Sequence, residues 1–85
     1  MNKYLVESPH KLEDCGKVLG LTEAAGFLTH FDWGCRDGVH CGWAIFEAES
    51  PAQAMLAVPS VAREMARAVR LNKFVPEEVM PLHAA

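Results

Sequence analysis

The chain has 85 residues, a length that suits one domain spanning residues 1–85 and leaves no room for a second. Hydrophobic residues make up 51% of it, which excludes a disordered chain, and a net charge of −3 without any basic run argues against a nucleic-acid partner. No apolar stretch approaches the roughly 18 residues that a membrane span needs, and Glu7 and Pro9 interrupt the start before a secretory signal could form, so we expect a cytoplasmic protein.

The first expected elements are a strand and a helix. Residues 2–7 are rich in β-prone side chains, and Pro9 is expected to end this strand because it lacks an N–H and restricts the residue before it. From about residue 12 to 28, apolar residues recur at steps of three and four, which predicts a helix. Gly20 predicts a break in that helix, after which Thr22 would cap a second piece.

A β-hairpin is expected next. Asp37-Gly38 lies between the β-prone runs 30–36 and 39–48, a pattern typical of a two-residue type I′ turn. In that register Cys35 lies directly opposite His40, with Cβ atoms about 4.5–5.5 Å apart on the same face of the sheet.

The second half begins with clear helix signals. Ser50 is the expected N-cap, Pro51 suits the first helical position, and Gln53 is the third-position partner of a capping box. Pro59 should interrupt the helix, and Ser60 should cap a further turn.

A last strand is expected over residues 67–74, followed by a helical turn that opens at Pro76 and ends near Pro81. The resulting order is β-α-β-β-α-β, which predicts an α+β, ferredoxin-like fold. We expect a four-stranded antiparallel sheet in the order 4-1-3-2, with both helices on one face.

This topology gathers His and Cys residues at one rim of the sheet. Imidazole and thiolate ligands suit nickel, zinc or copper, so the sequence predicts a transition-metal site. Cys41 is included as a candidate ligand, although strand alternation places it on the face of the sheet opposite to Cys35 and His40. Ordinary core packing stays open as an alternative, because buried Cys is common and no Cys-x₂-Cys spacing is present. The candidate metal ligands are His10, Cys15, Cys35, His40 and Cys41.

A second hypothesis is an enzyme or small-ligand binder in which His10 or His40 acts as a general acid or base. Its apolar cavity, between sheet and helices, would be lined by Tyr4, Phe31, Trp33 and Trp43. A third is a non-catalytic assembly module. The sheet face without helices would carry several apolar side chains, which predicts a homodimer through that face. These side chains are Leu5, Cys41, Trp43 and Ile45.

Two stretches carry a resemblance to known families. The run from His40 to Ala48, followed by Ser50-Pro51-Ala52-Gln53-Ala54, is similar to a family of small nickel-binding, ferredoxin-like bacterial proteins, and residues 69–76 look like that family's last strand and Pro-Glu tail. The overall plan also resembles the dimeric α+β barrel superfamily, whose members include small isomerases and monooxygenases. The resemblance implies a ferredoxin-like fold and a metal, with nickel as one option.

Overall fold

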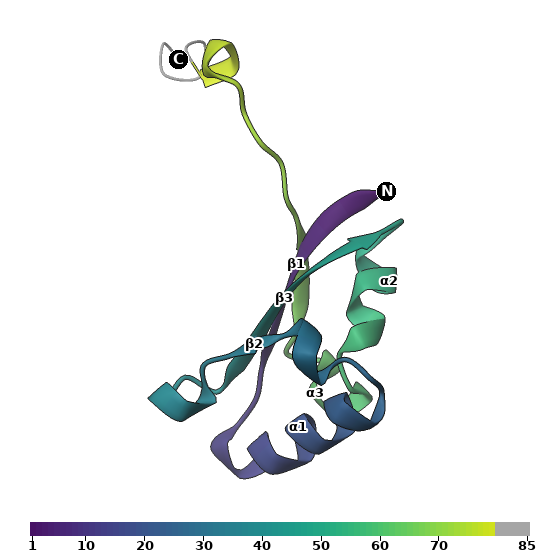
Figure 1. Cartoon of the computed structure of the whole chain (residues 1–85), viewed down its shortest axis with the longest axis vertical. Helices are drawn as coiled ribbons and strands as arrows, with labels where there is room; N and C mark the ends of the chain where they lie inside the picture. The colour runs from purple at the N-terminus through teal and green to yellow at the C-terminus, as the bar shows by residue number, and fades with distance from the viewer. Residues whose placement is uncertain (80–85) are drawn as a thin grey trace.

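The computed structural model describes residues 1–79 and has an α+β fold, as expected (Figure 1). None of the described helices has the length and apolar character to cross a bilayer. The strands are β1 (Asn2–Pro9), β2 (Asp32–Trp33), β3 (Cys41–Ala48) and β4 (Arg67–Arg70), and the helices are α1 (Cys15–Ala24), α2 (Pro51–Ala54) and α3 (Ser60–Arg63). Short 3₁₀ turns lie at Leu12–Asp14, Leu28–His30, Cys35–Asp37 and Met55–Ala57.

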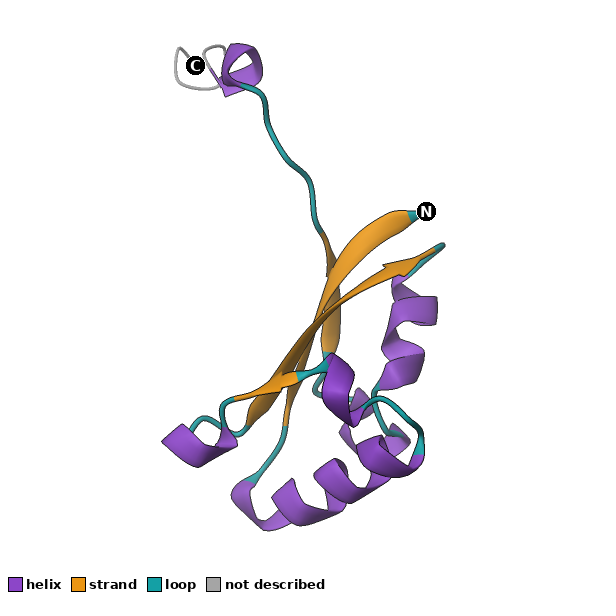
Figure 2. Cartoon of the chain, in the orientation of Figure 1, coloured by secondary structure: helices purple, strands orange, loops and turns teal. Residues whose placement is uncertain are grey.

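The four strands form one antiparallel sheet in the order β2-β3-β1-β4, which reads 4-1-3-2 from the β4 edge. β1 is central, since it pairs with β3 along its whole length and with β4 over four residues. The helices lie on one side of this sheet (Figure 2).

Burial alternates along the central strands as the period of two requires. In β1, Tyr4, Val6 and Ser8 are buried, and opposite them on β3 lie Phe46, Ala44 and Gly42. This face packs against the helices to form the core, which includes the fully buried Val18 and Val58. The predicted division of β3 is therefore confirmed, with Trp43, Ile45 and Glu47 on the other face.

The prediction that β1 stops before Pro9 was wrong, because the strand includes Pro9. The next residue, His10, donates its backbone N–H to the carbonyl of His40 at 2.9 Å. Backbone groups alternate in direction along a strand, so the missing N–H of Pro9 faces away from β3. On that side β4 pairs no further than Glu7, and the proline therefore interrupts no hydrogen bond.

The expected two-residue hairpin turn was also wrong. β2 has only two residues, and a 3₁₀ turn at Cys35–Asp37 replaces the rest of the predicted strand. Gly38 has φ +81°, and the N–H groups of Gly38 and Val39 donate to the carbonyls of Cys35 and Gly34 in a Schellman arrangement. The register of Trp33 opposite Gly42 is nevertheless the one that a two-residue Asp-Gly loop would give.

The predicted break at Gly20 is absent, and α1 runs without interruption to Ala24. The buried residues on either side, Val18 and Thr22, hold this helix on the core, and Thr22 donates its hydroxyl to the Val18 carbonyl at 2.7 Å. The helix ends after Ala24. Gly26, with a φ of +85°, then forms a Schellman arrangement like the one at Gly38.

The N-cap of α2 at Ser50 is confirmed, since the Gln53 N–H donates to the Ser50 hydroxyl at 3.1 Å, but the reciprocal bond of the predicted capping box is not formed. The Gln53 side chain accepts from the N–H of Glu49 rather than that of Ser50. Before α3 the N-cap is Pro59, so Ser60 is the first helical residue and not the cap.

β4 is shorter than the predicted 67–74. It runs antiparallel to β1, and its last hydrogen bond, from Leu71 to Lys3, comes where β1 begins. Residues 71–75 then extend away from the domain as an arm (Figure 1). Residues 76–79 are helical, as expected, and the predicted end near Pro81 lies outside the described residues.

Candidate metal centre

The candidate site begins with two histidines that face each other across the end of the β1–β3 ladder. His10 continues the buried row of Val6 and Ser8, so its side chain points toward the helix layer. Its backbone hydrogen bond to His40 makes the two residues direct cross-strand neighbours. Their ring centroids are 5.8 Å apart.

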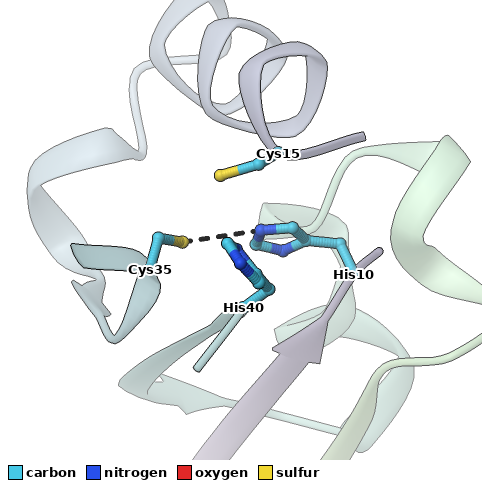
Figure 3. Close-up of side chains that lie close together, drawn as sticks. All are labelled: His10, Cys15, Cys35 and His40. Atoms are coloured by element: carbon cyan, nitrogen blue, oxygen red, sulfur yellow. Dashed lines mark hydrogen bonds between the residues drawn. The ribbon is translucent and has the colours of Figure 1, made fainter. Parts of the chain in front are cut away.

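Two cysteines approach these histidines from other elements. Cys15 is the first residue of α1, and Cys35 is the first residue of the 3₁₀ turn after β2. Figure 3 shows both thiols and both imidazole rings converging on one point. One ligand atom from each of the four residues lies within 4.8 Å of all the others, and the Cys35 Sγ is 3.5 Å from the His10 Nε2.

The predicted juxtaposition therefore exists, but its construction differs from the expectation. Cys35 is not paired with His40 in a β-ladder, because β2 has ended two residues earlier. A turn carries Cys35 to the site, and strand pairing brings His10 opposite His40 instead. Reading β1 through Pro9 would have revealed that pairing, since an antiparallel ladder extends in register.

The site is partly enclosed. His10 is buried and the other three residues are half-buried. Among the described residues, the Nδ1 atoms of His10 and His40 are buried without a hydrogen-bond partner. Buried imidazole nitrogens normally have such a partner.

Burial also shifts the acid–base chemistry. Desolvation lowers the pKa of His10, and it outweighs the hydrogen bond to the Ser8 backbone, which raises this pKa. The nearby His40 lowers it further, and Asp14 has a small opposite effect. Burial raises the pKa of the Cys35 thiol, and the adjacent Cys15 thiol raises it further. Both shifts favour the uncharged forms of these two side chains.

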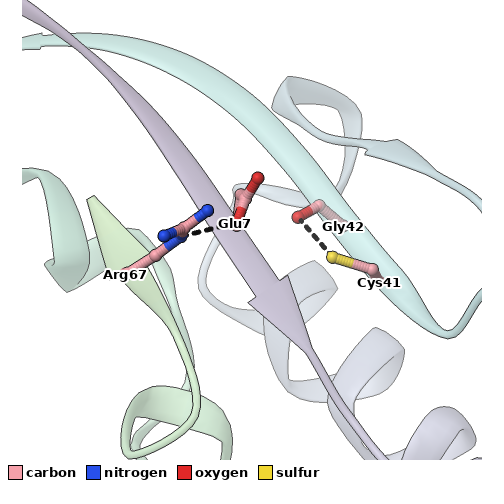
Figure 4. Close-up of polar contacts among 4 residues, drawn as sticks. All are labelled: Glu7, Cys41, Gly42 and Arg67. Atoms are coloured by element: carbon pink, nitrogen blue, oxygen red, sulfur yellow. Dashed lines mark hydrogen bonds and ion pairs between the residues drawn. The ribbon is translucent and has the colours of Figure 1, made fainter. Parts of the chain in front are cut away.

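Cys41 does not belong to the cluster. Its side chain lies on the opposite face of the sheet, where its thiol donates to the Gly42 carbonyl at 3.6 Å (Figure 4). Burial raises the pKa of Cys41, and Glu7 contributes to the same shift. Including Cys41 among the candidate ligands was therefore wrong, whereas the expectation that it points away was right.

The predicted aromatic cavity is only partly present. Tyr4 and Phe31 are buried core residues, whereas Trp43 lies on the face without helices. Trp33 packs over Gly42 and donates its indole N–H to the Leu28 carbonyl at 3.2 Å. A cavity of about 390 Å³ does adjoin Cys35, lined by Leu19, Leu28, Phe31, Asp32, Trp33, Cys35 and Arg36.

Comparison of the chain with protein-family models, with curated proteins and with solved structures found no match.

Proposed function

We propose that the protein binds one transition-metal ion through His10, Cys15, Cys35 and His40. The observation that carries this proposal is the convergence of four metal-ligating atoms within 4.8 Å, supplied by the end of β1, the start of α1 and the loop between β2 and β3. The first two residues and the last two are separated by a long stretch of chain, with 25 positions between His10 and Cys35, and tertiary structure brings the two pairs together. Each residue type is a common ligand of transition metals.

The distances support the same proposal. Zinc lies about 2.3 Å from a thiolate and about 2.0–2.1 Å from an imidazole nitrogen, so a tetrahedral site separates sulfur from nitrogen by about 3.6 Å. The 3.5 Å between the Cys35 Sγ and the His10 Nε2 matches that edge.

Two thiolates and two imidazoles suit Zn²⁺ best among the metals that the residues suggest. Zinc with four protein ligands in a tetrahedron has no open position for substrate, so this donor set favours a structural or metal-storage role over catalysis. Bound metal would join β1, α1 and the β2–β3 loop at one rim. Copper and nickel ions would compete with zinc for the same donor set, and nickel is also implied by the family resemblance.

The experiment is metal analysis and titration of protein prepared without a His-tag. We expect one zinc ion per chain. Cobalt added to the metal-free protein should give the absorption of a tetrahedral thiolate complex, and zinc should then displace the cobalt and abolish that absorption. His40→Ala and Cys35→Ser should each weaken zinc binding by roughly 100-fold, because four ligands share a binding free energy of about 10–16 kcal/mol.

Two variants serve as matched controls. Cys41→Ala removes a thiol on the opposite face, and His30→Ala removes an exposed imidazole outside the cluster. Both should keep the zinc affinity of the wild type. A wild-type protein that binds neither zinc, copper nor nickel, or ligand variants that bind as well as these controls, would show that the cluster is not a metal site.

A second candidate function is binding of a small apolar molecule, with His10 as acid or base. The observation in its favour is the cavity of about 390 Å³ beside Cys35, which has Phe31 and Trp33 in its lining. Its test is a ligand that quenches Trp33 fluorescence in metal-free protein. Activity lost in His10→Ala without any metal requirement would favour this candidate over the metal site.

A further inference from the structure

The edge of β3 that faces β2 is unpaired over the second half of the strand. β2 pairs only with Gly42 and Trp43, and the chain before β2 leaves the sheet in the 3₁₀ turn Leu28–His30. β3 continues to Ala48, and no other described strand pairs with it on this side (Figure 2). We call residues 44–48 the free edge. Unpaired backbone groups at the edge of a sheet can accept another strand.

The hydrogen bonds around β3 determine which backbone groups point outward from the free edge. The Gly34 N–H, which comes from the β2 side, donates to the Cys41 carbonyl at 3.0 Å. Backbone groups alternate in direction along a strand, so the N–H and C=O groups of Ile45 and Glu47 also point to this side, away from β1. An antiparallel strand placed there would bond to these two residues and would continue the ladder that β2 begins.

Two cavities flank the free edge, one on each face of the sheet. The first has a volume of about 270 Å³ and lies on the face without helices, where Trp43, Ile45 and His30 contribute to its lining. The second has a volume of about 290 Å³ and lies on the helix side, between α2 and the rings of Phe27 and Phe46. Successive side chains of a strand point to opposite faces, so an added strand would direct its side chains alternately toward the two cavities. This arrangement suits an extended peptide.

The surroundings of the free edge carry negative charge. Asp32 is exposed where the edge begins, and Glu47 and Glu49 are exposed where it ends. Within the described part of the chain none of these three carboxylates forms an ion pair, not even with Lys3, which lies opposite Glu47 on β1. A segment that approaches this edge is therefore attracted if it carries basic side chains.

We propose that the free edge binds an extended, basic segment of another protein by strand addition. The side chains of that segment on the helix side are apolar, because Ala48 and Leu56 help to line the cavity there. Those on the other face are lysine or arginine, because they lie beside Glu47 and Glu49. The free edge is separate from the metal centre, which lies at the other end of β3.

Other occupants fit the free edge less well. The arm of a second copy is extended and exposes Phe74, but Pro76-Glu77-Glu78 follow it and would bring two more carboxylates to an acidic edge. Nucleic acids and anionic membranes are repelled by the same carboxylates.

The experiment uses the full chain and a fluorescein-labelled peptide of about seven residues in which lysine and valine alternate. Fluorescence anisotropy should show saturable binding with a Kd below about 0.1 mM. Hydrogen exchange followed by NMR should show that the backbone amides of Ile45 and Glu47 become protected at saturation. A peptide that does not bind at about 1 mM, or that leaves the exchange of both amides unchanged, would overturn the proposal.

Matched controls separate strand addition from simple attraction of charge. In the antiparallel register the lysines lie opposite Ile45 and Glu47, so N-methylation of the lysines should weaken binding by at least about tenfold, whereas N-methylation of the valines should leave the Kd within about threefold. Glu47→Lys should weaken binding at least about tenfold, and Glu64→Lys, the same change at an exposed site near β4, should not. Equal Kd values for the two methylated peptides, or for the two variants, would overturn the proposal. Wild-type oligomers in which the Ile45 and Glu47 amides are protected without peptide would also overturn it, because a second copy would then fill the edge.

Discussion

Gly42 lies directly opposite Trp33 on the helix-facing side of the sheet, and the indole ring covers it. A Cβ atom at position 42 would lie 2.7 Å from Cζ3 and 2.9 Å from Cε3 of Trp33. The ring cannot move aside freely, because it donates to the Leu28 carbonyl and packs against Phe31 with centroids 5.3 Å apart. Gly42→Ala should therefore lower the free energy of unfolding by about 1–3 kcal/mol, the usual cost of overpacking.

Gly20→Ala is the matched control. Gly20 lies within α1 with a backbone that other residues adopt, and a Cβ there would meet nothing within 4 Å. The same substitution should then stabilise the protein by up to about 1 kcal/mol, the difference in helix propensity. Urea unfolding followed by circular dichroism measures the free energy of unfolding of both variants. In thermal unfolding, each kcal/mol should shift the melting temperature from that of the wild type by about 4–8 °C. This reasoning would be refuted if Gly42→Ala had the same free energy of unfolding as the wild type, or the same free energy of unfolding as Gly20→Ala.

Three further predictions concern oxidation, capping and pH. Diamide, a thiol oxidant, should join Cys15 to Cys35 by a disulfide in metal-free protein, because their sulfur atoms lie within 4.8 Å of each other. Thiol titration should then find one free cysteine of three, and bound zinc should slow the reaction. Peptide mapping that links Cys15 or Cys35 to Cys41 would contradict the cluster. Ser50→Ala removes the acceptor of the Gln53 N–H and should lower the free energy of unfolding by about 1 kcal/mol, whereas Ser50→Asp should retain it; equal losses in both variants would show that the cap is unimportant. Because burial lowers the folded-state pKa of His10 below the value of 6.5 in the unfolded chain, the unfolded state binds protons more readily, and metal-free protein should lose stability as the pH falls below about 6.5. Unfolding curves at several pH values measure this effect, which should be smaller in His10→Gln, and stability that increases on acidification would contradict it.

Local patterns were enough where the physics is local. The alternation of β3 predicted which of its side chains face the helices, since a pleated strand permits only two faces. The cap at Ser50 was equally evident, because its hydroxyl bonds an N–H only three residues away.

Patterns failed where two local structures use the same residue. A glycine with positive φ suits both a type I′ turn and the end of a helical turn, so Asp37-Gly38 did not distinguish them. The close approach of the chain at Gly34, where a Cβ would lie 2.8 Å from the Val39 carbonyl oxygen, belongs to the second structure. Similarly, Gly20 weakens a helix in isolation, but burial of Val18 and Thr22 holds α1 together.

For the candidate metal centre, the sequence by itself determined the ligand types and the rim at which they gather. His10 follows the first strand, Cys15 follows the turn after it, and both Cys35 and His40 lie in the loop between β2 and β3. Only the tertiary structure decided which atoms meet. His10 pairs with His40 because the ladder of β1 and β3 continues past Pro9, and it can continue because the proline's missing N–H faces the side where no strand lies.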